Sequence, residues 1–314
     1  MKLVFCGTPS FAVPTFKTVL RAGHQIALAV TQPDRPAGRG MRVVIPPVKE
    51  AAIAAGVPVV QPEKIKSNAE FRIRLESIQP DAILVVAYGR IIPKWMLDLP
   101  RFGNLNLHGS LLPKYRGAAP VQWAIANDEP VTGVTTMRLD EGLDTGDILM
   151  QREMAIAPDQ TATHLYPLLA EMGAALMVET LDGLASGTIT PQKQDHALAS
   201  HAPILTRDDG RMDFTQPAMI VYNRWRGFQP WPGAWTLLGG KKLTAHRLMP
   251  LEPSALSGVP TAPGEIHVYD GRLFVRCGAG TLLELVDVQL EGKKRMAAAD
   301  FLRGHSLHTG DRLG

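Results

Sequence analysis

The chain has 314 residues, of which 45% are hydrophobic and 20% are charged. This length exceeds that of an ordinary single domain, and the composition is that of a globular protein, so we expect two folded domains and no long disordered stretch. Up to Leu205 the chain carries 19 basic and 19 acidic residues, whereas the remainder carries 14 basic and 11 acidic ones. A positive bias in the last third favours a polyanionic partner, although an ordinary solvated surface explains it equally well.

The first apolar run, at residues 2–6, is too short for a signal peptide or a membrane span, because Gly7 and Pro9 interrupt it. We therefore expect a cytoplasmic protein that is not bound to a membrane. The cysteines, Cys6 and Cys277, lie far apart in the sequence and outside any metal-ligand spacing. Neither a disulfide framework nor a metal site is expected, and Cys6 is expected to lie in the core.

Residues 2–30 predict the strand, helix and strand that open an α/β sheet. Apolar runs of strand length cover residues 2–6 and 25–30, and residues 10–22 between them show a helical pattern with Ser10 as the N-cap. The turn after the first strand lacks the G-x-G-x-x-G pattern with which dinucleotide-binding folds approach a pyrophosphate. We therefore expect a Rossmann-like sheet without a NAD site.

A polar insertion follows at residues 31–42. It contains Arg35, Arg39 and Arg42 but almost no apolar residue, so it cannot pack a core. Loops of this length in compact domains are usually functional or disordered, and a guanidinium group matches the geometry of a phosphate. We interpret the insertion as a phosphate-contacting loop, with a merely flexible surface loop as the alternative.

Residues 48–93 continue the alternation of helices and strands. The patterns predict helices at residues 48–55 and 68–78, and strands at residues 57–60 and 82–87. The second strand opens into a loop at residues 88–93, where a glycine lets the backbone approach a ligand closely. A simple turn is the alternative for that loop.

A strand at residues 105–107 ends in His108, and the chain then breaks into Gly109, Ser110 and Pro113. Asn106 and His108 are two residues apart, so their side chains share one face at the carboxyl end of the strand, where open α/β sheets keep their sites. A histidine can take or give a proton near neutral pH, and an asparagine amide can donate to a developing oxyanion. A purely structural histidine is the alternative.

An acidic run occupies residues 140–147, after a helix at 121–126 and a strand at 133–139. Its spacing does not match a calcium-binding loop, so no metal is expected there. Its Asp144 can instead hold the imidazole of His108, as carboxylates do in hydrolytic triads. Ser110 lies outside a G-x-S-x-G pattern, so no nucleophile is implied, and the residues suit direct acyl transfer between two bound substrates.

A strand is expected at residues 148–156 and a long helix at 163–184, and the apolar pattern of the sequence changes after them. Residues 187–205 are polar and irregular, which indicates a linker between a domain at residues 1–186 and a domain at residues 206–314. The last domain combines short strands with helices, a pattern that indicates a small OB-like β-barrel. The expected strands cover residues 234–238, 242–248, 264–269, 273–275 and 282–289, and the helices cover residues 217–227 and 298–303.

Two stretches carry a resemblance to the formyltransferase family that uses 10-formyltetrahydrofolate. They are Asn106-x-His108-Gly109-Ser110-Leu111-Leu112-Pro113-x-Tyr115-Arg116-Gly117 and Asp140-x-Gly142-Leu143-Asp144-Thr145-Gly146-Asp147. Residues 31–42, 47–49, 228–235 and 292–296 further resemble the branch of that family that acts on methionyl-tRNA. The resemblance covers essentially the full chain in order, and it implies a Rossmann-like domain with a mostly parallel sheet followed by the small barrel.

The resemblance implies roles for individual residues. The catalytic ones are Asn106, His108 and Asp144. Those that contact the folate are Ser110, Leu111, Leu112, Pro113, Val86, Tyr88, Gly89, Ile91, Asp140 and Gly142. Those that contact tRNA are Arg35, Arg39, Arg42, Lys49, Arg224, Lys293, Lys294 and Arg295.

The implied reaction is transfer of the formyl group of 10-formyltetrahydrofolate to the α-amino group of methionyl-initiator tRNA, through a tetrahedral intermediate. It implies a monomer that needs no metal, no NAD and no obligate protein partner. Three alternatives stay open: formyl transfer to a small amine such as an amino sugar nucleotide or a purine precursor, hydrolysis of the formyl-folate, and a non-catalytic tRNA-binding protein in which His108 is structural.

Overall fold

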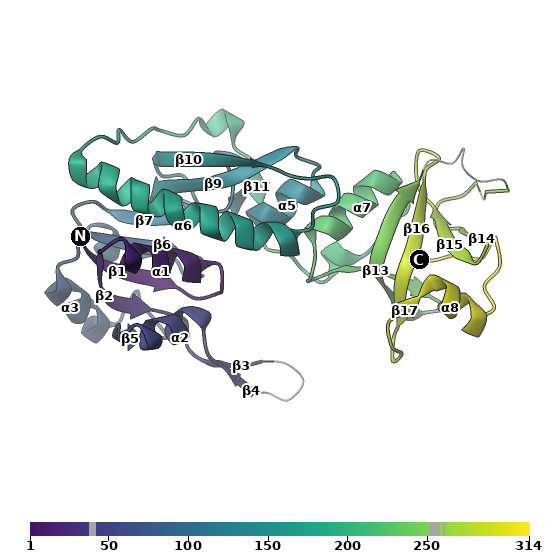
Figure 1. Ribbon diagram of the computed structural model, residues 1–314, viewed down its shortest axis with the longest axis horizontal. Helices are drawn as coiled ribbons and strands as arrows, with labels where there is room; N and C mark the ends of the chain where they lie inside the picture. Colours follow the sequence, from purple (N-terminus) through teal and green to yellow (C-terminus); the bar gives the residue numbers. More distant parts are fainter. Residues whose placement is uncertain (38–41, 252–257, 260) are drawn as a thin grey trace. The chain divides into compact units, whose positions relative to one another are not determined.

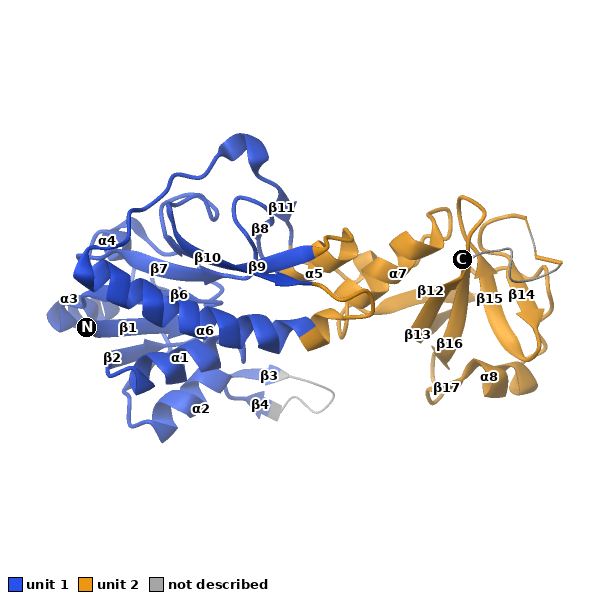
Figure 2. Cartoon of the chain, turned by 45° about the horizontal axis from the view of Figure 1, so that its top comes forward, with its two compact units in different colours: residues 1–120, 131–155, 165–203 blue, residues 121–130, 156–164, 204–314 orange. Residues whose placement is uncertain are grey.

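The computed structural model describes residues 1–37, 42–251, 258–259 and 261–314 (Figure 1). The chain divides into two compact units, drawn in different colours in Figure 2. Unit 1 holds residues 1–120, 131–155 and 165–203, and unit 2 holds residues 121–130, 156–164 and 204–314. Within the described residues, no helix is both long and apolar enough to cross a membrane.

Unit 1 is built on a seven-stranded sheet. Five neighbouring strands are parallel, the next strand runs antiparallel to them, and the edge strand beyond it pairs antiparallel with that strand. The prediction of a Rossmann-like, mostly parallel sheet is confirmed. In spatial order the strands are β10 (Ile148–Ala155), β9 (Val131–Arg138), β7 (Asn104–His108), β6 (Ala82–Val86), β1 (Lys2–Gly7), β2 (Gln25–Val30) and β5 (Val59–Val60).

Helices cover both faces of this sheet (Figure 1). On one face, Phe5 of β1 packs edge to face against Phe16 at 5.2 Å, and the Leu107 side chain of β7 fits against Gly173. On the other face, the alternate residues Val4 and Cys6 belong to a buried cluster with side chains of two further helices. The helices of the first face are α1 (Ala12–Arg21) and α6 (Ala162–Ser186), with α2 (Pro47–Ala54) beside α1, and those of the second are α3 (Ala69–Ile78) and α4 (Lys94–Leu97).

Two expected helix caps have different outcomes. Asn68 caps α3, because its side-chain oxygen accepts a hydrogen bond from the Phe71 amide. The expected cap at Ser10 is wrong, since α1 begins at Ala12 and has Phe11 in the cap position without a side-chain bond. The amide of Ala12 instead donates to the carbonyl of Pro9, so the backbone of the preceding turn satisfies the helix end.

The insertion expected as a loop contains regular structure. Its described ends form a two-stranded antiparallel ribbon of β3 (Arg35–Ala37) and β4 (Arg42–Val44). Val43 and Val44 supply the β-branched residues that favour a strand, and both are exposed. Arg39 lies outside the described residues.

Residues 192–202, which we call the strap, lie in the stretch expected to be a linker and belong to unit 1. The strap contains a short 3-10 helix (His196–Leu198) and the strand β11 (His201–Ala202). β11 pairs in parallel with β8 (Arg116–Gly117), and both are labelled together in Figure 2. The strap is thus hydrogen-bonded to the segment that follows His108.

Unit 2 contains a six-stranded antiparallel sheet. All five strands expected from the sequence are present, and a short sixth strand pairs with the last of them in chain order. Two helices, α7 (Ala218–Gly227) and α8 (Ala298–Gly304), pack on the sheet around a core that includes Val221, Leu285 and Phe301. In order the strands are β12 (Ala234–Leu238), β13 (Lys241–Leu251), β16 (Leu282–Leu290), β15 (Arg272–Arg276) and β14 (Ile266–Tyr269), with β17 (Met296–Ala297) on β16. All but the first residue of the helix α5 (Pro120–Ala126) also belongs to unit 2.

Candidate active site

β7 carries three polar side chains at alternate positions along its length, Asn104, Asn106 and His108, which therefore share one face of the sheet. Asn104 is structural, because its amide nitrogen donates to the carbonyls of Met96 and Leu97 in α4, at 2.8 and 3.2 Å. Asn106 is only 9% exposed, and its amide has no hydrogen-bond partner among the described residues. A nearly buried amide without a partner is poised to bind a substrate group.

The imidazole of His108 is held from both sides. Its Nε2 lies 2.8 Å from the carbonyl oxygen of Tyr115, and its Nδ1 lies 3.7 Å from Oδ2 of Asp144. A carbonyl can only accept, so Nε2 carries a proton and the lone pair of the neutral ring lies on Nδ1. The ring nitrogen able to take up a proton therefore faces the carboxylate.

Asp144 reaches His108 because its loop folds back over the sheet. β9 runs antiparallel to β7, so the loop that follows β9 starts beside Leu105, at the other end of β7. Asp144 adopts a positive φ of 53°, and its Oδ2 accepts a hydrogen bond from the Gly117 amide at 2.8 Å. Aspartate is one of the few residues that tolerates this conformation. A backbone amide thus fixes the carboxylate opposite the imidazole.

The expected folate residues Asp140 and Gly142 shape the start of this loop. Oδ1 of Asp140 accepts hydrogen bonds from the Gly142 amide and the Thr145 hydroxyl, at 3.0 and 2.7 Å. A Cβ atom on Gly142 would lie 2.0 Å from the same hydroxyl oxygen, so a larger residue there would displace the Thr145 side chain. In this structure both residues hold the turn that leads to Asp144.

The loop at residues 110–113 is supported from the sheet beneath it. The hydroxyl of Thr135 donates to the Ser110 carbonyl at 2.6 Å and accepts from the Leu112 amide at 3.1 Å. Gln151 donates to the same hydroxyl and to the Leu112 carbonyl, at 3.0 and 2.9 Å. Pro113 follows a cis peptide bond. The hydrogen bonds with Thr135 and Gln151 fix the backbone of this loop, which follows directly after His108 in the chain.

The loop after β6 contains the expected residues Val86, Tyr88, Gly89 and Ile91. The Tyr88 side chain is buried in the core, which raises the pKa of its phenol. Its carbonyl accepts hydrogen bonds from Thr8 and from Gln32, so this carbonyl already has protein partners. Ile91, by contrast, is 91% exposed. Of this loop, Ile91 offers the largest apolar surface to a ligand.

No protein nucleophile is presented beside His108 in the described part of unit 1. The Ser110 hydroxyl donates to the Lys114 carbonyl at 2.6 Å. Cys6 is fully buried in the core, and burial raises the pKa of its thiol. The other cysteine, Cys277, is buried in unit 2, where burial raises its pKa to about 12. These side chains agree with direct transfer between two substrates.

Lys49, expected to contact tRNA, has internal partners. Its ammonium group lies 2.6 Å from Oδ2 of Asp34 and 2.7 Å from Oε1 of Gln61. The hydrogen bonds from Lys49 and Gln61 lower the pKa of the Asp34 carboxyl. Asp34 directly precedes β3, so Lys49 anchors the base of the ribbon. On the ribbon itself, the Arg35 side chain is exposed.

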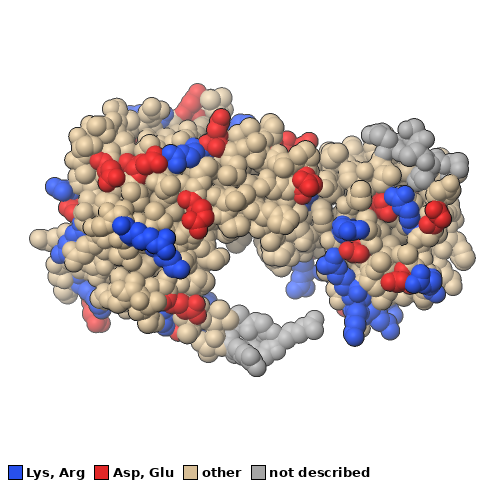
Figure 3. All heavy atoms as spheres, in the orientation of Figure 1, with Lys and Arg blue, Asp and Glu red and all other residues tan. Residues whose placement is uncertain are grey.

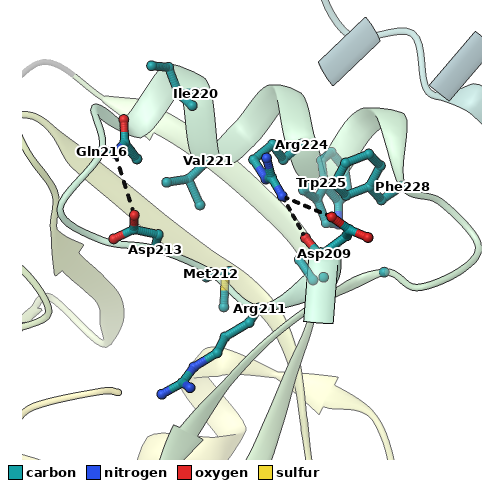
Figure 4. A pocket seen from close by; sticks show the side chains of 13 residues that line it. Asp209, Arg211, Met212, Asp213, Gln216, Ile220, Val221, Arg224, Trp225 and Phe228 are labelled. Carbon is teal, nitrogen blue, oxygen red and sulfur yellow. Dashed lines mark hydrogen bonds and ion pairs between the residues drawn. The ribbon is translucent and has the colours of Figure 1, made fainter. Parts of the chain in front are cut away.

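Arg224, also expected to contact tRNA, lines a hollow in unit 2 (Figure 4). Its guanidinium lies over the rings of Phe228 and Trp123, at 5.0 and 5.7 Å, and donates to the Asp209 carbonyl at 3.1 Å. Contacts of this kind hold a guanidinium in place. The hollow contains none of the three candidate catalytic residues.

Lys293, Lys294 and Arg295 are exposed in the turn between β16 and β17. Arg295 donates to Asp287 at 2.8 Å, whereas neither lysine has a carboxylate within ion-pair distance in the described residues. Figure 3 shows Lys and Arg side chains gathered along one edge of unit 2. The two lysines therefore present uncompensated charge to solvent.

Four residues of the site could not be found from the sequence: Thr135, Gln151, Arg116 and Gln194. Thr135 and Gln151 pair across β9 and β10, a relationship that appears only once the register of the strands is known. Arg116 falls within the motif but shows no pattern that assigns it a role. Gln194 lies 50 residues from the loop that it contacts, and a glutamine in a polar stretch carries no signal.

An amide and an imidazole at a strand end of an α/β sheet, with a carboxylate fixed beside the imidazole, are groups that suit acyl transfer. Residues 1–181 match the family described as formyl transferase, and residues 204–306 match the formyl transferase C-terminal domain. The chain belongs to the formyl transferase family and is a formyl-transferring enzyme.

Curated relatives match over the full length. A protein of Acidobacterium capsulatum named methionyl-tRNA formyltransferase is 68% identical over 314 residues, which is 100% of both chains. A protein of Koribacter versatilis with the same name is 55% identical and covers 100% of this chain and 99% of its own.

Solved structures share the fold at low identity. An N-formyltransferase from Helicobacter canadensis, crystallised with folinic acid and dTDP-3-aminofucose, has a TM-score of 0.66 at 18% identity and covers 91% of this chain and 98% of its own. HypX from Aquifex aeolicus, crystallised with tetrahydrofolic acid, has a TM-score of 0.62 at 17% identity and covers 96% of this chain and 47% of its own.

Proposed function

We propose that the chain transfers the formyl group of 10-formyltetrahydrofolate to the α-amino group of methionyl-initiator tRNA. The observation that carries the proposal is the 68% identity, over 314 residues, to a relative named methionyl-tRNA formyltransferase. This similarity includes unit 2 as well as the site in unit 1. The geometry around His108 supplies the chemistry that such a transfer needs.

Asn106 binds the formyl oxygen. When the amine attacks the formyl carbon, negative charge develops on that oxygen, and a hydrogen-bond donor fixed in advance stabilises it. The Asn106 amide is nearly buried and has no partner among the described residues, so it breaks no protein hydrogen bond when it donates. We assign Asn106 to the oxyanion.

His108 and Asp144 transfer a proton from the attacking amine to the leaving folate nitrogen. The attacking amine must lose one proton, and the leaving folate nitrogen must gain one. Nδ1 of His108 accepts the first while Nε2 stays hydrogen-bonded to Tyr115, and the carboxylate at 3.7 Å stabilises the imidazolium that results. The same proton then passes to the folate nitrogen, directly or through a water molecule, which returns the ring to its neutral form.

The residues around the site fit a flat, partly apolar donor. Ile91 and Leu143 are large hydrophobic residues with exposed fractions of 91% and 64%, on the loops at residues 87–93 and 140–147. Exposed apolar side chains beside a polar catalytic group are the usual lining of a ligand site. We propose that they contact the folate together with the loop at residues 110–113.

We propose that residues 1–186 form the catalytic domain, that residues 187–205 connect the two domains, and that residues 206–314 hold the tRNA backbone. Exposed lysines that have no carboxylate partner among the described residues, such as Lys293 and Lys294, suit phosphate contacts that carry no sequence information. Arg35, together with Arg39 and Arg42, is assigned to the acceptor end. The proposed catalytic residues all come from one chain, so a monomer in the cytoplasm suffices for the reaction.

The test supplies 10-formyltetrahydrofolate with one of three acceptors: initiator tRNA charged with methionine, the same tRNA uncharged, and a dTDP-linked amino sugar. We expect formylation of the charged tRNA only, and its loss in His108→Ala with unchanged tRNA binding. Formylation of the sugar alone would overturn the choice of acceptor. Release of formate without any acceptor would indicate a hydrolase, and full activity of His108→Ala would remove the catalytic assignment.

A further inference from the structure

Arg116 is a buried cation without a carboxylate partner. It is 5% exposed, and no acidic side chain lies within ion-pair distance of it in the part of the chain that the structure describes. Its Nε and Nη2 donate to Oε1 of Gln194 at 3.1 and 2.6 Å, and its Nη1 lies 3.2 Å from Nδ1 of His196. A buried charge is tolerated only when its hydrogen bonds are satisfied, so Arg116 depends on these two residues of the strap.

Gln194 joins Arg116 to the backbone around Asp144. Its amide nitrogen donates to the carbonyls of Asp144 and Gly146, at 2.9 and 2.7 Å. The opposite orientation of the amide would place an NH2 group against the guanidinium and an oxygen against two carbonyls, so the chemistry fixes the orientation. Gln194 is 6% exposed, and both ends of its amide are used.

The strap also holds the other side of His108. The Tyr115 amide donates to the Ser200 hydroxyl at 2.9 Å, and the Arg116 amide donates to the Ser200 carbonyl at 2.8 Å. Tyr115 has a positive φ of 61°, as Asp144 has one of 53°. Positive φ at non-glycine residues costs free energy and persists only where the surroundings enforce it. The strap bonds to the backbone at both positions that contact the imidazole.

We propose that Gln194 and Arg116 are positioning residues, which keep the Asp144 carboxylate in place beside His108. Gln194 acts through the Asp144 backbone, and Arg116 acts by orienting Gln194. Neither residue touches the reacting atoms. The proposal rests on the catalytic assignment of His108 and Asp144 made above.

Gln194→Glu tests whether Gln194 positions the Asp144 loop or only anchors the strap to Arg116. Glutamate keeps an oxygen for Arg116 and adds an opposite charge, so the strap stays bound to the guanidinium. Its second oxygen, however, cannot donate to the carbonyls of Asp144 and Gly146 and repels them. We expect kcat to fall about 10- to 100-fold, the range known for the loss of a supporting hydrogen bond behind a metal ligand, while KM for both substrates stays near the wild-type value.

Gln192→Glu is the matched control. Gln192 lies on the same strap with an exposed side chain, and it is its backbone that pairs with Ile148. The same change of charge at this position should leave kcat unchanged. A loss of activity in both variants would show that any added negative charge on the strap is harmful, and the proposal would fail.

A double-mutant cycle with Asp144→Asn completes the test. If Gln194 acts through the Asp144 carboxylate, Gln194→Glu should lower kcat by less than about 3-fold in the Asp144→Asn background. An equal loss in both backgrounds, or wild-type kcat in Gln194→Glu alone, would overturn the positioning role. Wild-type activity of Asp144→Asn by itself would instead overturn the catalytic assignment, so the two failures are distinguishable.

Discussion

Nδ1 of His108 lies 3.7 Å from Oδ2 of Asp144, and the same carboxylate oxygen accepts a 2.8 Å hydrogen bond from the Gly117 amide. The backbone, rather than the imidazole, therefore fixes the carboxylate. The Asp144 carboxylate keeps this hydrogen bond to Gly117 whether or not the imidazole is protonated. This arrangement lets Nδ1 accept a proton and then stabilises the resulting cation without any rearrangement.

Asp144→Asn should remove the charge and keep the shape. Asparagine tolerates the positive φ, and its amide oxygen can still accept from Gly117. We expect kcat to fall by roughly 10²- to 10⁴-fold, the usual contribution of acid–base catalysis, with a Tm close to that of the wild type. Steady-state formylation and thermal melting measure the two effects. Glu141→Gln, in the exposed part of the same loop, is the control and should keep full activity.

Thr135→Val should loosen the loop at residues 110–113. The hydroxyl serves the Ser110 carbonyl and the Leu112 amide, and its loss leaves these buried groups unsatisfied. We expect a loss of about 1–3 kcal/mol in the free energy of unfolding, together with a raised KM for the formyl donor. Denaturant titration and initial rates at varied donor concentration measure both.

Thr136→Val is the matched control for that variant. Thr136 is the next residue on β9, and its side chain lies on the opposite face, where its hydroxyl bonds to Thr180 at 2.7 Å. This substitution should also reduce stability but leave the donor KM unchanged. An equal rise of KM in both variants would mean that the effect comes from general loosening of β9.

The strand that carries Asn106 and His108 could be predicted because its pattern is local. Alternation along residues 104–108 places Asn106 and His108 on one face whatever the rest of the chain does. The acidic loop suggested Asp144 as a partner, and the structure brings the two side chains within ion-pair distance. The backbone bond from Gly117 could not be predicted, since it depends on how two loops fold back over the sheet.

The hydrogen bonds of the strap could not be predicted from the sequence. Gln194, His196 and Ser200 form no apolar periodicity, so the stretch indicates a linker when it is considered alone. Its structure comes from hydrogen bonds to residues far away in sequence, such as the Tyr115 amide. The ribbon of β3 and β4 was missed for a related reason, because an exposed two-stranded ribbon has no buried face to impose alternation on its residues.

Lys49→Met should change the acid sensitivity of unit 1. The hydrogen bond from Lys49 lowers the pKa of Asp34 below its usual value of 3.8. A carboxyl whose pKa is lower in the folded state adds stability that is present above the unfolded pKa and is lost as the pH falls through the folded pKa. The wild type should therefore melt at a higher temperature than the variant near pH 7, and the gap should narrow below about pH 4. A gap that stays constant between pH 7 and pH 2 would contradict this account.

Lys293→Ala combined with Lys294→Ala should weaken tRNA binding through charge alone. Both lysines are exposed and have no carboxylate partner in the described part of unit 2, so each can neutralise a phosphate. The slope of log Kd against log salt concentration should become shallower by about 2, since each phosphate contact contributes close to one. Lys17→Ala with Arg21→Ala on α1 removes the same charge from exposed positions of unit 1 and should leave the slope unchanged. If the two double variants change the slope equally, net charge governs binding, and the turn between β16 and β17 is not a specific phosphate contact.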